Sequence, residues 1–291
     1  MRSSNPVFSR RGFSRDTGYA GFNTGQTAQA GNPYAANAHA APDAGPAGAN
    51  PYAQAPQAAG QTYQAPAPPR GAVMTIDDVV TRTGITVGLV VVMAIASWIA
   101  QVPLGIAVGA ALVAMVLGFV QSFKRKAAPA LILAYAAFEG VFLGAFSRFV
   151  DQQWANGAAM QAVIGTMCVF AAVLVLYKTR IIRVTQRFYR FVMAAAIGFI
   201  LLMGINLLCA VLGIGGADGL GFRSGTLGIV LGIAGVLLGA CFLALDFKQV
   251  EDGIAYGAPR EESWLAAFGL TLTLVWIYLE FLRLIAILND N

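Results

Sequence analysis

Seven runs of apolar residues, each close to the length of a bilayer crossing, follow one another through the last three quarters of the chain. Because about 20 helical residues cross the ~30 Å of hydrocarbon, each run is expected to form one transmembrane helix. The composition agrees, since 57% of the residues are hydrophobic and 11% are charged. The predicted spans cover residues 84–101, 103–121, 128–149, 158–177, 191–213, 225–247 and 264–288. The chain is therefore predicted to be an all-α membrane protein, a seven-transmembrane-helix bundle over residues 75–291.

Residues 1–74 have a different composition from the predicted bundle. They are rich in Ala, Gly, Pro and Gln, nearly free of Ile, Leu and Val, and repeat Asn-Pro-Tyr-Ala at residues 32–35 and 50–53. Such a segment cannot bury enough apolar surface to offset the entropy lost on ordering. We therefore expect residues 1–74 to form a disordered tail on the cytoplasmic side.

Basic residues at the span ends predict the orientation of the bundle, because Lys and Arg near such ends are retained in the cytoplasm. The loops on one side carry Lys124, Arg125, Lys126, Lys178, Arg180, Arg183, Arg187, Arg190, Lys248 and Arg260. The loops on the other side offer only Arg148 and Arg223. This asymmetry predicts a multi-pass protein of the cytoplasmic membrane with the N-terminus inside and the C-terminus outside. The net charge of +5 then reflects membrane topology and lipid contact, and no nucleic-acid partner is expected.

Missing residue types argue against enzyme chemistry. The single histidine, His39, falls in the predicted tail, so no histidine-built zinc site can form within the spans. The last span contains no lysine for a retinal Schiff base. The sequence also lacks a P-loop, a dinucleotide fingerprint and a serine nucleophile elbow. We therefore expect a protein that is not an enzyme and that needs no cofactor.

Three carboxylates, Glu139, Asp246 and Glu280, lie inside the apolar runs. An ionised acid at the bilayer centre costs at least ~2.5 kcal/mol, so such acids persist mainly where they bind something or exchange protons. In the sixth span Asp246 continues a stripe of small residues formed by Gly228, Gly232, Gly235 and Gly239. In the seventh span Glu280 shares a face with Ala266, Gly269 and Thr273. Helical spacing therefore predicts that Asp246 and Glu280 both face the bundle interior.

Two inward carboxylates within a few ångström of each other cannot both ionise easily, so Asp246 and Glu280 are expected to share a proton. When both are ionised, their oxygens suit Ca²⁺, and protonation removes that attraction. The pair is thus predicted to sense protons, to gate a path and to bind Ca²⁺ transiently. Glu139, Asn206 and Arg283 are expected to line or support the path.

Other interpretations of these polar residues stay open. Arg283, three residues after Glu280, could neutralise that acid within one helix. Asp246 could be a solvated acid near Lys248 at the end of its span. If the seventh span begins near residue 264, Glu280 lies sixteen residues in, about 24 Å from that end, and far from the level of Asp246. The two acids then meet only if that span starts deeper or outside the membrane plane.

Short motifs in the last two spans resemble a known family. Leu-Asp-Phe at residues 245–247, Tyr-Leu-Glu-Phe at residues 278–281 and the opening Met-Arg-Ser-Ser-Asn-Pro-Val-Phe are similar to the Bax inhibitor family of transmembrane proteins, in its bacterial, actinobacterial branch. The resemblance covers roughly residues 75–288 and implies a pH-sensitive Ca²⁺ leak gated by a pair of acids, here Asp246 and Glu280. Many members have Asp in place of Glu280, and the acid that some carry in the second span is missing here.

The sequence thus predicts a pH-sensitive cation leak channel, with Ca²⁺ as the expected ion. The alternative is a non-conducting membrane regulator that binds a membrane protein partner such as a protease. A small-solute transporter is a third possibility, although no inverted repeat or pair of discontinuous helices supports it.

Overall fold

The computed structural model describes residues 73–290 apart from residue 125, residues 215–219 and residues 223–224. The tail predicted to be disordered therefore lies outside the described residues, except for Val73 and Met74. Arg125 and Arg223, two of the basic residues used to predict the orientation, also lie outside the described residues.

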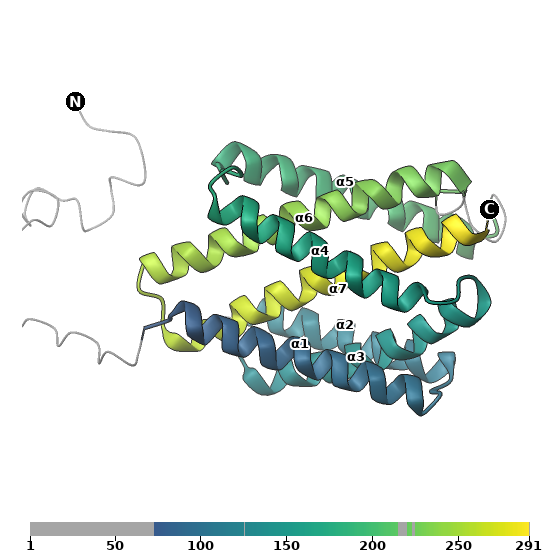
Figure 1. Ribbon diagram of the computed structural model, residues 1–291, viewed down its shortest axis with the longest axis horizontal. Coiled ribbons are helices and arrows are strands. Elements are labelled where there is room, and N and C mark those ends of the chain that lie inside the picture. The colour runs from purple at the N-terminus through teal and green to yellow at the C-terminus, as the bar shows by residue number, and fades with distance from the viewer. Residues whose placement is uncertain (1–72, 125, 215–219, 223–224, 291) are drawn as a thin grey trace, which may run out of the picture. The chain divides into compact units, whose positions relative to one another are not determined.

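Seven α-helices, each long and apolar enough to cross a membrane, make up the described part of the chain (Figure 1). They are α1 Ile76–Ile99, α2 Leu104–Phe123, α3 Pro129–Gln153, α4 Ala158–Lys178, α5 Gln186–Val211, α6 Gly225–Ala255 and α7 Ser263–Asp290. A single turn of 3₁₀ helix, η4 (Arg260–Glu262), leads into α7. The predicted all-α class and the seven spans are confirmed.

Helix α7 has the most central position in the bundle. It packs against α1, α3, α4 and α6, and Figure 1 shows it between α5 and α6 on one side and α1, α2 and α3 on the other. Helix α5 packs against α6, and α2 packs against α3, at the two edges. Polar side chains on α7 are therefore placed to meet several neighbouring helices.

Two helices extend well beyond the apolar runs that predicted them. Helix α1 begins at Ile76 because Thr75 caps it, its hydroxyl accepting a hydrogen bond of 3.2 Å from the Asp78 backbone N–H. Helix α6 continues to Ala255 through a polar segment in which Lys248 Nζ lies 2.7 Å from Asp252 Oδ1, one turn later. A hydropathy scan detects only the apolar part of such helices, so it places these ends eight residues too far inward.

The turn between α6 and α7 is fastened to the start of α1. The Met74 backbone N–H donates to Ala258 O at 2.8 Å. Arg260 Nε lies 2.8 Å from Asp78 Oδ1, and Arg82 donates to the backbone oxygen of Arg260. These bonds join the start of α1 to the turn that precedes α7. They therefore help to fix the position of α7 along α6.

Helices α1 and α3 approach each other at glycines of α3. A Cβ added to Gly144 would lie 2.1 Å from Ala94 O, and one added to Gly140 would lie 2.5 Å from Val90 O. Only residues without a side chain allow backbones this close. The small-residue stripe in the third span, beside Glu139, thus serves the contact between α3 and α1.

Candidate functional site

Glycines of α6 bring its backbone against the side chains of α7. A Cβ on Gly232 would lie 2.4 Å from Leu284 Cδ2, and a Cβ on Gly239 would lie 2.6 Å from Ile277 Cγ1. Trp276 Nε1 donates to Gly235 O at 3.2 Å. The stripe identified in the sequence is therefore the surface of α6 that receives α7, and we call this contact the α6–α7 interface.

Asp246 lies in the α6–α7 interface, as its place on the stripe predicts. Its Oδ2 accepts a hydrogen bond of 2.6 Å from the Thr273 hydroxyl on α7. A Cβ on Gly269, one turn earlier on α7, would lie 3.6 Å from Asp246 Oδ1. Lys248, the cation expected to accompany a solvated Asp246, pairs instead with Asp252. Because α6 continues nine residues further, Asp246 lies about 13 Å from the end of its helix.

Glu280 lies in the same interface but has other neighbours. Arg283 Nη2 lies 3.1 Å from Glu280 Oε2, and the side chains of both residues are 12% exposed. A Cβ on Gly235 of α6 would lie 2.8 Å from Glu280 Cδ. The alternative in which Arg283 neutralises Glu280 within α7 is therefore the arrangement that the structure shows.

The two acids occupy different levels of the α6–α7 interface. Gly269 and Thr273 face Asp246, and they precede Glu280 by eleven and seven residues. At 1.5 Å per residue, the levels of the two acids differ by roughly 10 to 16 Å. The direct contact expected between Asp246 and Glu280 does not form among the described contacts. Helical periodicity places both acids correctly on the inward faces, but it does not determine how far one helix is shifted along the other.

Glu139 and Asn206 lie away from the α6–α7 interface. Glu139 is 9% exposed on α3, between Tyr135, whose ring packs edge-on against Phe268 of α7, and Leu143. Asn206 on α5 is 1% exposed, and its Oδ1 accepts a bond of 2.9 Å from the Leu220 backbone N–H. Asn206 therefore supports the segment before α6, whereas Glu139 is a buried acid of α3, one turn after the residue that packs against α7.

Sequence reasoning missed two further polar contacts of α7. The hydroxyls of Thr86 on α1 and Thr271 on α7 lie 2.8 Å apart in a buried position. The hydroxyls of Ser147 on α3 and Tyr278 on α7 lie 2.6 Å apart. Hydroxyl residues inside apolar runs commonly make such contacts between helices, so their presence was the available signal. Helix α7 thus carries polar side chains toward α1, α3 and α6.

A cavity of about 630 Å³ lies among α1, α3, α4 and α7. Five polar residues contribute to its wall, but most of the lining is apolar, as at Val91 and Ile95. The polar residues are Ser147, Asp151, Thr166, Thr271 and Tyr278. The acid Asp151 accepts a hydrogen bond from the Gly157 N–H, so this mostly apolar surface offers few groups that can replace the hydration of a cation.

At the expected Ca²⁺ site the structure shows one carboxylate, that of Asp246, beside one hydroxyl, that of Thr273. Within the described ranges, no group of three His, Cys, Asp or Glu side chains is arranged to hold a metal ion. Asp246 and Thr273 could contact a passing cation, but Ca²⁺ ordinarily takes six to eight oxygen ligands. Water would have to supply most of them, which suits brief binding better than tight binding.

These features define a polytopic α-helical membrane protein in which a glycine-lined helix pair encloses acidic side chains. The family model described as Bax inhibitor 1 like matches residues 5–290, so the chain belongs to that family. No curated protein matches the chain at a significant level.

Proposed function

We propose that this protein is a pH-sensitive cation leak of the cytoplasmic membrane and that Ca²⁺ is the cation it conducts. The observation that carries the proposal is the 2.6 Å hydrogen bond between Asp246 and Thr273, inside a helix pair held together by glycine contacts. Membership of the Bax inhibitor 1 like family is compatible with a channel role. In this proposal Asp246 is the proton-sensing residue, and no proton is shared directly with Glu280.

The proposed mechanism depends on the charge of Asp246. An ionised Asp246 attracts a cation to the α6–α7 interface and accepts the hydrogen bond from Thr273. Protonation removes that charge, and the resulting carboxyl group can itself donate a hydrogen bond. Proton binding therefore lowers cation occupancy and changes the contact that joins α6 to α7.

Glu280 and Arg283 form the second control point in the proposed path. Arg283 places a positive charge in the interface, 3.1 Å from Glu280. An ionised Glu280 offsets that charge. In this proposal the pair stays ionised, so it sets the charge of the path without adding a second response to pH. Glu139 and Asn206 support the surrounding helices.

The proposed orientation follows from the basic residues. Lys178, Arg180, Arg183 and Lys248 gather where α4 and α6 end, which is the end of the bundle where α1 begins. We call this the basic end and place it in the cytoplasm. The C-terminus of α7 then lies outside.

Calcium flux into liposomes that contain the purified full-length chain tests the proposal. The leak predicts a flux well above that of protein-free liposomes, and the flux should change with pH. It should also survive deletion of residues 1–72, because the proposed path lies within the helices. A flux equal to that of protein-free liposomes at every pH would contradict it.

A non-conducting regulator that binds a membrane protein partner is the second candidate. Helix α5 offers a surface for such a partner, because it packs against α6 at the edge of the bundle and exposes Phe191, Ile200 and Leu208. A partner helix could cover this surface as lipid does. This candidate predicts no flux and, where the partner binds the tail, loss of function when residues 1–72 are deleted.

A further inference from the structure

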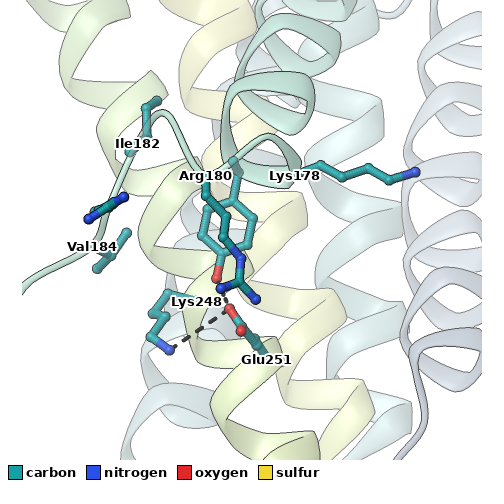
Figure 2. A pocket seen from close by; sticks show the side chains of 8 residues that line it. Lys178, Arg180, Ile182, Val184, Lys248 and Glu251 are labelled. Carbon is teal, nitrogen blue, oxygen red and sulfur yellow. Dashed lines mark hydrogen bonds and ion pairs between the residues drawn. The ribbon is translucent and has the colours of Figure 1, made fainter.

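A cavity of about 600 Å³ lies at the basic end, between the segment that joins α4 to α5 and the last turns of α6 (Figure 2). Apart from two aliphatic residues, its lining is charged or aromatic. These lining residues are Tyr177, Lys178, Arg180, Arg183, Lys248 and Glu251. Four are basic and one is acidic, so the cavity has a positive electrostatic potential. We call it the basic pocket.

The single acid of the basic pocket is already engaged. Glu251 accepts a hydrogen bond from the Tyr177 hydroxyl and lies 3.8 Å from Lys248 Nζ. Lys248 also pairs with Asp252. In contrast, no salt bridge joins a carboxylate to Arg180 or Arg183 within the part of the chain that the structure describes. The two guanidinium groups, together with Lys178, are therefore the cations of the lining that no described salt bridge engages.

Arg180 occupies a backbone position that favours glycine. Its φ angle is 57°, in the left-handed region. It follows the end of α4, where its N–H donates to Tyr177 O at 2.9 Å and the Ile181 N–H donates to Leu176 O at 3.0 Å. This is a Schellman motif, whose left-handed residue is usually glycine. An arginine here places a guanidinium on the pocket at some conformational cost. Residues that keep such strained backbone conformations are often found at functional sites.

Figure 2 shows how the labelled basic side chains lie. Arg180 extends toward Lys248 and Glu251, whereas Lys178 points away from them. Arg183 and Tyr177 also line the pocket, so its basic side chains include two guanidinium groups and Lys248. An arginine fork binds the oxygens of a phosphate group with parallel hydrogen bonds.

The surroundings of the basic pocket suit a lipid better than a soluble anion. The pocket lies at the end of a membrane-spanning helix, where Tyr177 has the position of an interfacial aromatic residue. Beside it Val175 is 57% exposed and Ile181 is 69% exposed, so apolar side chains face the bilayer next to the charges. A phospholipid can place its phosphate among the arginines and its acyl chains on this apolar surface.

We propose that the basic pocket binds the phosphate of an anionic phospholipid headgroup through Arg180 and Arg183, with Lys248 adding positive charge. Basic pockets at helix ends on the cytoplasmic side are known to hold such headgroups. This site is separate from the α6–α7 interface, and its occupancy does not require that the protein conduct ions. The simpler explanation, in which the arginines only orient the protein in the membrane, predicts that removing any basic residue at this end weakens binding of an anionic lipid to the same extent.

The test measures binding of a short-chain phosphatidylglycerol to the full-length protein in neutral detergent, with phosphatidylcholine and inorganic phosphate as the two other ligands. Arg180→Gly and Arg183→Gln each remove one guanidinium, and glycine suits the backbone of residue 180. Arg190→Gln on α5 is the matched control, because it removes one charge from the same basic end outside the pocket lining. Thermal unfolding of each variant without lipid reports whether it folds.

We expect phosphatidylglycerol to bind more tightly than phosphatidylcholine, and its affinity to fall about tenfold in Arg180→Gly and in Arg183→Gln. Arg190→Gln should bind like the wild type, and Arg180→Gly should unfold at the wild-type temperature or above. Equal affinity for the two lipids, or an equal loss in Arg190→Gln, would overturn the proposal. Phosphate that binds as tightly as phosphatidylglycerol would show that the site serves a soluble anion, which would also overturn it.

Discussion

Thr273 on α7 donates a hydrogen bond of 2.6 Å to Asp246 on α6, and this bond crosses an interface in which Gly269 of α7 faces the same carboxylate. Asp246 is thereby held against α7, about 13 Å from the C-terminal end of α6. Any change in its protonation acts directly on the contact between the two helices.

The Thr273 hydroxyl can be removed with little change of shape by Thr273→Val. Asp246 then lacks its described donor, so we expect the free energy of unfolding to fall by about 1 to 3 kcal/mol. Thr273→Ser keeps the hydroxyl and should lose much less. Thermal unfolding of the detergent-solubilised proteins checks this. Equal stability of the valine and serine variants would show that the hydrogen bond contributes little.

Gly239→Ala tests the close approach of α6 and α7. The added methyl group would lie 2.6 Å from Ile277 Cγ1 and 3.2 Å from Trp276 Cδ1, so we expect a loss of about 1 to 3 kcal/mol through overpacking. Gly198→Ala on α5 is the control, since nothing lies within 4 Å of its added Cβ. That variant should be unchanged or slightly more stable, because alanine favours helix over glycine. Similar unfolding temperatures for the two variants would contradict the described packing.

Glu280 and Arg283 should be energetically coupled, because both side chains are 12% exposed and lie 3.1 Å apart. Removing either charge, by Glu280→Gln or Arg283→Gln, leaves the other in a poorly hydrated position and should cost a few kcal/mol, on the order of 3. The double variant should cost less than the two single changes together.

A second double-mutant cycle on Lys248 and Asp252 serves as the comparison. Their side chains are 35% and 44% exposed, and exposed ion pairs contribute about 0 to 1 kcal/mol. The Glu280 and Arg283 cycle should therefore give the larger coupling energy. Additive effects of Glu280→Gln and Arg283→Gln would show that the pair does not act as a unit.

The fold class and the inward direction of the acids follow from the sequence. Long apolar runs determine the number of spans, because the bilayer requires a fixed helix length. Glycines spaced by three and four residues identify the face of α6 that packs against α7, and Asp246 lies on that face. These predictions succeed because each depends on spacing within one helix.

The shift of α7 along α6 could not be predicted in the same way. It depends on the polar turns that carry α6 to Ala255 and on the short connection through η4 to α7. Contacts with α1, such as that of Arg260 with Asp78, help to hold this connection. Hydropathy does not detect these features. The prediction that Asp246 contacts Glu280 directly was therefore wrong. The other possibility, in which Glu280 lies far from the level of Asp246, is the arrangement that the structure shows.

The pH dependence of Ca²⁺ flux through Asp246→Asn in liposomes tests the central claim most directly. Asparagine keeps the shape of the side chain but cannot ionise, and Asp77→Asn in the first turn of α1 removes an exposed acid as a control. We predict that flux through the wild type and through Asp77→Asn changes with pH, whereas flux through Asp246→Asn is nearly independent of pH. A flux curve for Asp246→Asn that follows the wild type over the whole pH series would contradict the account.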